Sequence, residues 1–186
     1  HFSMADACVC CGIVGKRGSG KSTLMKVYRA RAKRSLVWDW KGEYDGTVID
    51  SLSAVADLFH QRKFRAVYRA PRWATVKEFD ALCHVLLHVG SDFMFLVDEA
   101  ASVCHGYSEG GLGQLLRFSR DQRIDLIWSS QKPTKLPGVF ITEVNTMHVF
   151  HLHGRHDLIA LSEVLTDQEL QRVAALPPHE YLTVNL

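Results

Sequence analysis

The sequence has no apolar run close to the roughly 20 residues that a bilayer-crossing helix needs. It also lacks an opening segment in which basic, apolar and small residues follow one another as in a secretory signal. Internal repeats, low-complexity tracts and linkers are absent. With 186 residues, of which 47% are hydrophobic and 23% charged, we therefore expect an intracellular globular domain with one core.

Neither charge nor cysteine dominates the composition. The formal net charge is only +2, so bulk charge does not identify a nucleic-acid partner, although clustered basic residues leave local positive surface. Three of the five cysteines, Cys8, Cys10 and Cys11, fall within one apolar segment, where small core residues are expected. Zinc sites need separated ligand pairs, so we predict free thiols without a metal centre built on them.

What the sequence does contain is a phosphate-binding loop. It consists of Gly15, Lys16, Arg17, Gly18, Ser19, Gly20, Lys21, Ser22 and Thr23. The glycines let successive N–H groups turn toward the α- and β-phosphates, Lys21 reaches the β- and γ-phosphates, and the Ser22 hydroxyl can bind Mg²⁺. An apolar strand before the loop and a helix after it give the order that this motif requires, which disfavours the alternative of a glycine-rich surface turn.

Apolar periodicity predicts strands and helices that alternate along the chain. Strands are expected at residues 7–14, 35–40, 64–68, 93–97, 125–130 and 147–152, with a final extended piece at 181–184. Helices are expected at 21–33, 53–61, 76–89 and 112–120, and one or two more within 157–175. This alternation predicts an α/β fold in which helices cover both faces of a mainly parallel sheet.

Two carboxylates follow the apolar strand at residues 93–97, as in a Walker B element. Asp98 would hold Mg²⁺ through its water shell, and Glu99 would polarise the water that attacks the γ-phosphate. A helix N-terminus with charge in its first turn is the alternative. The second acid favours hydrolysis of ATP over transfer to another hydroxyl, because a kinase gains nothing from activating water.

A glutamine follows the next predicted strand. Gln131 comes after Trp128-Ser129-Ser130, and in a parallel sheet that strand end lies beside the phosphates. Gln131 could therefore sense the γ-phosphate or orient the water, although glutamine also occurs as a capping or turn residue.

Four segments together carry a family resemblance. They are Gly15 to Thr23, Trp38-Asp39-Trp40-Lys41-Gly42-Glu43-Tyr44, Leu96-Val97-Asp98-Glu99-Ala100, and Arg120 ahead of Ile127-Trp128-Ser129-Ser130-Gln131-Lys132-Pro133. The series resembles the HerA/FtsK superfamily of P-loop ATPases over roughly residues 7 to 153. Within it, the chain is similar to the genome-packaging ATPases of membrane-containing double-stranded DNA viruses.

The resemblance implies a three-layer RecA-like (ASCE) P-loop NTPase with a mainly parallel central sheet flanked by helices. It implies ATP and Mg²⁺ as ligands and a homo-oligomeric ring, usually a hexamer, that threads double-stranded DNA through its pore. Capsid or vertex proteins would be partners, in the host cytoplasm or at a packaging vertex of the virion. We expect one P-loop ATPase domain over residues 4–186, with the three residues before Met4 as an expression remnant.

The same resemblance suggests residues that act between subunits. A neighbour's arginine can offset charge on the γ-phosphate, and Arg117 and Arg120 precede the Gln131 strand where that arginine would lie, with Arg120 preferred. They could equally be solvated residues of an amphipathic helix. Lys132 and Lys135, and the glycine-rich loop at residues 106–111, are the candidates for DNA contact, although loops are commonly polar for solubility alone.

The roles of several aromatic and basic residues stay open. Trp38, Trp40 and Tyr44 are expected in core or interface packing, with stacking on adenine as the alternative. The basic run Lys26, Arg29, Arg31, Lys33 and Arg34 fits a helix C-terminus as well as a DNA funnel or a subunit contact.

The leading hypothesis is an ATP-hydrolysing motor that translocates double-stranded DNA, packaging a viral genome into a preformed capsid. A related ATPase for filamentous virus extrusion or secretion is one alternative. A P-loop kinase acting on a nucleotide or another small molecule is a second, and a non-hydrolytic nucleotide-binding switch is a third, against which Glu99 argues.

Overall fold

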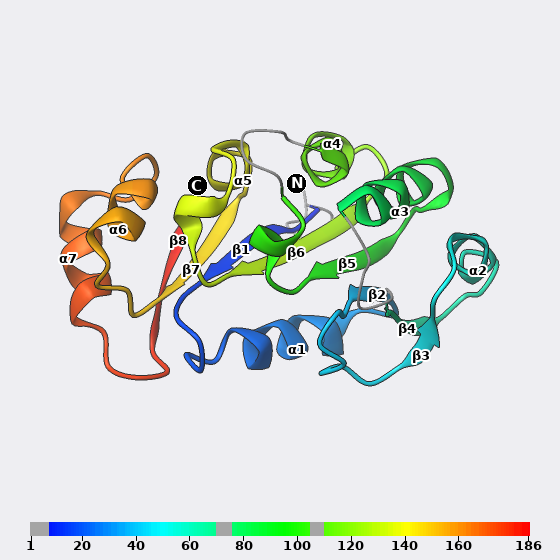
Figure 1. Ribbon diagram of the computed structural model, residues 1–186, viewed down its shortest axis with the longest axis horizontal. Coiled ribbons are helices and arrows are strands. Elements are labelled where there is room, and N and C mark those ends of the chain that lie inside the picture. Colours follow the sequence, from blue (N-terminus) through cyan, green and yellow to red (C-terminus); the bar gives the residue numbers. More distant parts are fainter. Residues whose placement is uncertain (1–7, 70–75, 105–109) are drawn as a thin grey trace, which may run out of the picture.

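The computed structural model describes residues 8–69, 76–104 and 110–186, and within them eight strands form one sheet (Figure 1). The strands are β1 (Cys10–Val14), β2 (Arg34–Trp38), β3 (Thr47–Ile49), β4 (Phe64–Tyr68), β5 (Phe93–Val97), β6 (Ile124–Ser130), β7 (Thr146–Phe150) and β8 (Tyr181–Asn185). The helices are α1 (Lys21–Arg31), α2 (Leu52–Leu58), α3 (Val76–Val89), α4 (Gly110–Phe118), α5 (Val139–Thr142), α6 (Arg155–Leu161) and α7 (Asp167–Ala175), with short 3₁₀ turns η2 (Ala100–Ser102) and η3 (Pro133–Lys135).

The strand order across the sheet is β3-β4-β2-β5-β6-β1-β7-β8. Every neighbouring pair is parallel except β7 and β8, which run antiparallel. The predicted α/β class with a mainly parallel sheet is therefore confirmed. One strand, β6, separates the phosphate-loop strand β1 from the acidic strand β5, so the carboxyl ends of all three meet at one edge.

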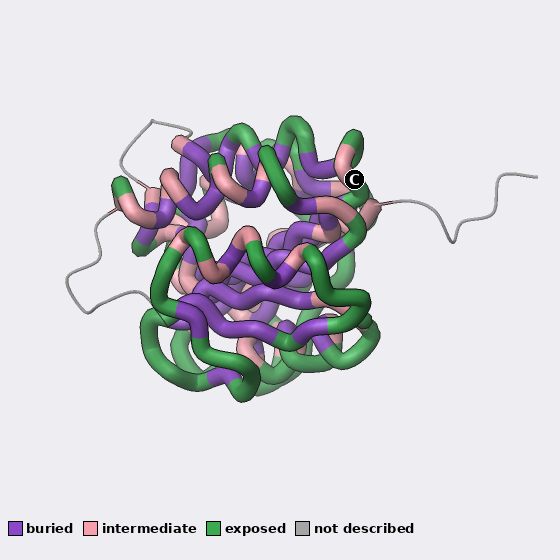
Figure 2. Tube along the Cα trace, turned by 90° about the vertical axis from the view of Figure 1, so that its right-hand side faces the viewer, coloured by how far each residue is buried: buried purple, intermediate pink, exposed green. Residues whose placement is uncertain are grey.

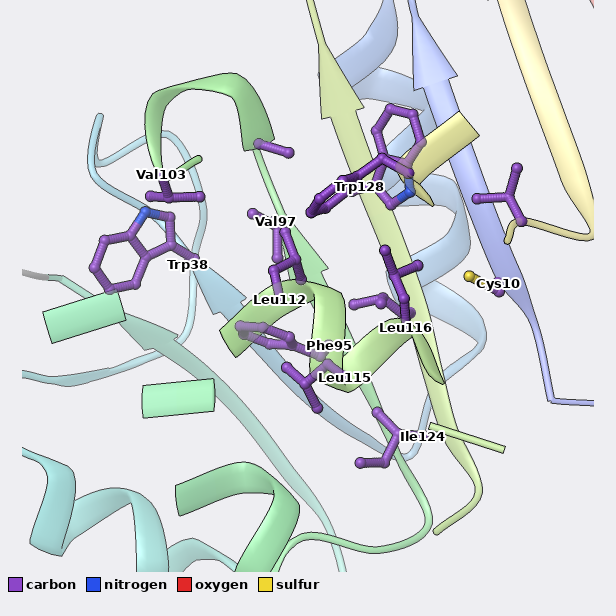
Figure 3. Packing of buried hydrophobic residues seen from close by; sticks show 14 of the residues in the cluster. Cys10, Trp38, Phe95, Val97, Val103, Leu112, Leu115, Leu116, Ile124 and Trp128 are labelled. Atoms are coloured by element: carbon purple, nitrogen blue, oxygen red, sulfur yellow. The ribbon is translucent and has the colours of Figure 1, made fainter. Parts of the chain in front are cut away.

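Helices cover both faces of the sheet. Helix α1 lies on one face, and α3, α4 and α5 lie on the other (Figure 1). On the α1 face, Met25 belongs to a buried cluster with Ile13 and Leu96. On the opposite face, Trp128 packs in a larger cluster with residues of α4 such as Leu112 (Figure 3). The inner strands of the sheet are accordingly mostly buried, whereas the edge strands β3 and β8 and many of the loops have exposed residues (Figure 2).

One close approach in the sheet depends on glycine. A Cβ added at Gly12 in β1 would lie 2.5 Å from Cζ2 of Trp128, a ring that is completely buried beside it. The backbone conformation of Gly12 does not require glycine, so the requirement comes from space alone. The Trp128 ring fills the volume that a side chain on β1 would otherwise take.

Most predicted elements lie where the pattern places them, with differences at their ends. Strand β1 begins at Cys10 rather than at residue 7, which lies outside the described residues. Helix α1 ends at Arg31 rather than at residue 33. Strand β2 ends at Trp38 rather than at residue 40, because the carboxylate of the following Asp39 accepts hydrogen bonds from the N–H groups of a turn. The segment at 157–175 forms two helices, and Thr166 starts the second with a capping box.

The remaining sequence-level expectations concern cysteines and membrane spans. The five cysteines are free, and burial raises the pKa of Cys10 and Cys11 to about 12, which keeps both as thiols at neutral pH. In the described part of the chain, no three side chains of His, Cys, Asp or Glu form a cluster suited to a metal. None of the described helices is long and apolar enough to cross a bilayer.

Candidate functional site

The phosphate-binding loop connects β1 to α1 at the carboxyl edge of the sheet. Gly18 and Gly20 have φ values of 76° and 110°, a region that glycine enters without strain. The Lys21 ammonium is folded back over the loop, where Nζ donates to the carbonyl oxygens of Gly15 at 2.8 Å and Lys16 at 2.7 Å. The loop therefore has its lysine inside the ring of backbone that would surround a phosphate.

Lys21 is only 6% exposed, and its environment changes its acidity. Burial lowers the pKa of Lys21, the negative charges of Glu99 and Asp98 raise it, and the positive charge of Lys41 lowers it again. When a buried ammonium makes hydrogen bonds only to carbonyl oxygens, its positive charge is poorly compensated. A phosphate bound in the loop would supply the missing negative charge.

Asp98 follows β5 and is held by two neighbours. The Ser129 hydroxyl of β6 donates to Oδ1 of Asp98 at 2.7 Å, and the Lys41 ammonium lies 3.9 Å from Oδ2. The Asp98 carboxylate is buried, and both Asp98 and Ser22 line the cleft described below. A buried carboxylate and a hydroxyl at the first turn of α1 are hard oxygen donors, which fit Mg²⁺ with water completing its shell.

Glu99 adopts a left-handed backbone conformation with φ 58° and ψ 61°, uncommon for a residue with a side chain. Its N–H donates to the Ser129 hydroxyl at 3.1 Å. Its Oε1 accepts the N–H of Gln131 at 3.1 Å and the Ser130 hydroxyl at 3.4 Å. The other oxygen, Oε2, is buried and has no hydrogen-bond partner among the described residues. One carboxylate oxygen is thus fixed by β6, and the other is available to a proton donor.

These groups open onto a cleft of about 890 Å³. Its lining residues are Arg17, Gly18, Gly20, Lys21, Ser22, Thr23, Trp40, Lys41, Glu43, Asp98, Glu99, Ala101, Ser102, Gln131, Lys132, Lys135 and His179. Six of the nine predicted loop residues therefore line one cleft with Asp98, Glu99 and Gln131, whereas Gly15, Lys16 and Ser19 are not among its lining residues. Their catalytic and binding roles stay predictions.

The two lysines predicted to contact DNA lie on the same cleft. Lys132 and Lys135 belong to the loop that follows β6, and both are exposed while lining the cleft. This position puts them beside the nucleotide site, and their contact with DNA stays a prediction. In the other candidate loop, residues 106–109 lie outside the described residues, and Gly110 and Gly111 begin α4.

The two candidate arginines lie away from this cleft. Arg117 is in the last turn of α4, and Arg120 lies between α4 and the first residue of β6. The seven residues of β6 span roughly 20 Å and separate Arg120 from Gln131 at the other end of the strand. Arg120 cannot reach the phosphate site of its own chain, so the predicted role requires a second copy.

Structure separates the three aromatic residues that the sequence groups together. Trp38 is buried and stacks on Tyr68 with ring centroids 5.6 Å apart, and Tyr44 is 1% exposed. The alternative that Trp38 or Tyr44 stacks on adenine is therefore wrong, because neither ring has an exposed face. Trp40 is half exposed on the cleft wall, so stacking on adenine stays a prediction for this ring alone.

Three site residues were not assigned a role from the sequence. Ser129 is linked to both acids, Lys41 lies beside Asp98, and His179 lines the cleft from the turn before β8. The segments that contain Ser129 and Lys41 are part of the family resemblance, which was the available signal. Nothing in the sequence singles out His179, because its place at the cleft depends on how β8 pairs with β7.

No protein-family model matches the sequence, and the search of curated proteins found no match. Among solved structures, the genome packaging NTPase B204 from Sulfolobus turreted icosahedral virus 2 in complex with ATP-gammaS matches with a TM-score of 0.80 and 20% identity, over 98% of this chain and 93% of that one. B204, the DNA-packaging ATPase from Sulfolobus turreted icosahedral virus, matches with a TM-score of 0.77 and 20% identity, over 97% and 92%. VirB4 of Thermoanaerobacter pseudethanolicus matches with a TM-score of 0.67 and 12% identity, over 94% and 86%.

Sheet order, helix placement and these likenesses define a RecA-like P-loop NTPase fold. Within that fold, the chain is similar over nearly its whole length to the viral packaging NTPase B204. The fold predicted from the HerA/FtsK resemblance is therefore confirmed.

Proposed function

We propose that this chain is an ATPase motor that hydrolyses ATP to ADP and phosphate and uses the energy to translocate double-stranded DNA. The observation that carries the proposal is the meeting of Lys21, Asp98 and Glu99 on one cleft, in a fold shared with a packaging NTPase. A nucleotide-binding domain needs only the first of these groups. The two acids, held by β6, are what hydrolysis needs in addition.

In this proposal, the phosphate loop and Lys21 hold the triphosphate, and Ser22 and Asp98 hold Mg²⁺. The metal would offset negative charge on the β- and γ-phosphate oxygens. Glu99 Oε2 accepts the proton of a water whose oxygen forms a bond to the γ-phosphorus. The bond from that phosphorus to the β–γ bridging oxygen breaks, and ADP leaves. Gln131 orients the water or senses the γ-phosphate.

The working form of the motor is a homo-oligomeric ring, a hexamer in the simplest case. The distance between Arg120 and its own phosphate site favours a site shared between subunits, completed by Arg120 or Arg117 of the neighbour. Lys132 and Lys135 follow β6, and the residues at the end of β6 make hydrogen bonds to the Glu99 side chain. Contact of these lysines with DNA phosphates would therefore couple DNA binding to the state of the nucleotide.

The substrate we propose is a viral genome that is driven into a preformed capsid. The likeness to B204, which is described as a genome packaging NTPase, supports this choice. Capsid or vertex proteins are then the partners, and the protein works in the host cytoplasm or on the virion at a packaging vertex.

A triplex-displacement assay tests translocation directly. A labelled third strand is annealed to one end of a linear duplex, and its release is followed after addition of protein, ATP and Mg²⁺. The proposal expects release that depends on ATP and is lost in Glu99→Gln. Hydrolysis without release, or phosphate transfer to an added acceptor by a protein indifferent to DNA, would contradict it and favour a kinase or another P-loop enzyme.

A further inference from the structure

Lys41 lies in a turn at the carboxyl end of β2 whose shape is fixed by a buried acid. The Asp39 carboxylate, 2% exposed, accepts the N–H of Glu43 at 2.9 Å and of Tyr44 at 3.1 Å. Nε of Arg69 lies 3.7 Å from the same carboxylate. Asp39 is therefore occupied by its own turn, while two other charged residues of the turn, Lys41 and Glu43, line the cleft, and Lys41 is its cation.

The turn is anchored to the phosphate-loop helix through Tyr44. Its ring is 1% exposed, and its hydroxyl donates to Sδ of Met25 at 3.5 Å. Ser22 is the residue expected to bind Mg²⁺. The Lys41 turn is thus packed, through the buried Tyr44 side chain, against the helix that also carries Ser22.

Sheet pairing brings this turn beside the Walker B acids. Trp38 of β2 is paired with Val97 of β5, so the residues after these two strands are neighbours. The Lys41 ammonium lies 3.9 Å from Oδ2 of Asp98 and 5.3 Å from the centre of the Trp40 ring. Its side chain is 26% exposed, so the ammonium is only partly withdrawn from water.

The Lys41 ammonium lies beside the carboxylate that, in the proposed function, holds Mg²⁺. Mg²⁺ held by Ser22 and Asp98 would neutralise Asp98 and repel the ammonium. MgATP as a whole carries net negative charge, most of it at the γ-phosphate end, which attracts the displaced ammonium. Both forces act in the same direction, from Asp98 toward the phosphate.

Building on the proposed ATPase function, we propose that Lys41 exchanges Asp98 for a γ-phosphate oxygen when MgATP binds. It then serves as a second catalytic cation from the same subunit. It is distinct from Lys21 of the phosphate loop and from an arginine supplied by a neighbour. ADP has no γ-phosphate, so with ADP bound Lys41 has no γ-phosphate oxygen to contact. Lys41 would thereby help the site distinguish ATP from ADP.

The ratio of ATPγS affinity to ADP affinity tests this exchange. Both dissociation constants and kcat are measured in Lys41→Met, in Lys41→Arg and in the wild-type protein at fixed Mg²⁺. We expect Lys41→Met to weaken ATPγS binding by about 10-fold while ADP binding changes little, and to lower kcat on the order of 10- to 100-fold. Lys41→Arg should regain part of both losses. Lys63→Met removes an exposed lysine next to the amino end of β4, at the opposite edge of the sheet, and is the matched control.

The outcomes separate the two proposals. An unchanged ATPγS-to-ADP ratio together with unchanged kcat in Lys41→Met would overturn the exchange and leave Lys41 as a partner of Asp98 only. If the wild-type protein fails to hydrolyse ATP, the ATPase proposal falls, and the affinity ratio still decides whether Lys41 contacts the γ-phosphate.

Discussion

The Ser129 hydroxyl donates a 2.7 Å hydrogen bond to Oδ1 of Asp98 across the paired strands β5 and β6. The Ser129 hydroxyl oxygen also accepts a hydrogen bond from the N–H of Glu99 at 3.1 Å. One buried hydroxyl of β6 therefore orients both the expected metal ligand and the expected base. This link explains how a strand between β1 and β5 takes part in the chemistry without carrying an acid itself.

Replacing Ser129 by alanine should impair hydrolysis and stability together. The change leaves Oδ1 of Asp98 and the N–H of Glu99 short of a partner in a buried place, which should lower the free energy of unfolding by about 1–3 kcal/mol. Misplaced acids should lower kcat roughly 10- to 100-fold. Denaturant unfolding and phosphate release measure the two effects. Ser53→Ala, at an exposed position of α2, is the control, and wild-type turnover in Ser129→Ala would show that the link is dispensable.

Glu99→Gln and Lys21→Ala should both stop turnover for different reasons. Glutamine keeps the size of the side chain but cannot accept a proton, so hydrolysis should fall by at least about 100-fold while nucleotide binding remains. Lys21→Ala removes the cation of the phosphate loop, so binding itself should weaken. A fluorescent nucleotide reports binding, and phosphate release reports turnover. Hydrolysis at the wild-type rate by either variant would refute the assignment of that residue.

Arg120→Ala should lose activity that a second, differently impaired subunit restores. If Arg120 acts on a neighbour's γ-phosphate, the substitution should lower kcat on the order of 10³-fold. Mixed with Glu99→Gln, Arg120→Ala subunits keep their own base and receive an intact arginine from the neighbour. Activity should therefore reappear in the mixture although neither variant hydrolyses ATP alone.

Arg117→Ala in the same mixing experiment decides which arginine acts between subunits. A mixture that stays inactive, with rings still formed by light scattering, would exclude a shared site of this kind. Full activity of Arg120→Ala alone would return Arg120 to the surface role that a charged helix end also explains.

Gly12→Ala should destabilise the sheet without touching the cleft. The added Cβ would lie 2.5 Å from the buried Trp128 ring, and relief of this overlap should cost about 1–3 kcal/mol of unfolding free energy. Gly138→Ala is a matched control, since its Cβ would meet only Oε2 of Glu163 at 3.9 Å and its φ of −53° suits alanine. Thermal unfolding compares the two. Equal stability of both variants would mean that the core repacks around Trp128.

Elements with strong apolar patterns are predicted from the sequence at the bounds observed, as with β4, α3 and β5. The missed elements are short. Strand β3 has three residues, two of them exposed, and α5 has four, so neither presents a full period to read. The antiparallel direction of β8 depends on its pairing with β7, which no local pattern encodes.

The site divides in the same way. The phosphate loop and the Asp98-Glu99 pair follow from local spacing, because their chemistry is carried by consecutive residues. Ser129 depends on the register of β6 against β5, and Lys41 depends on a turn closed by Asp39. Such contacts arise from tertiary structure, so a serine in a strand and a lysine in a turn have many ordinary explanations in the sequence alone.

Steady-state ATP hydrolysis, measured with and without double-stranded DNA over a wide range of protein concentration, tests the central claim most directly. A shared site in a DNA-translocating ring predicts a specific rate that rises cooperatively with protein concentration and rises again when DNA is added. A specific rate that is independent of both would contradict the motor and leave a P-loop nucleotide-binding domain with another task.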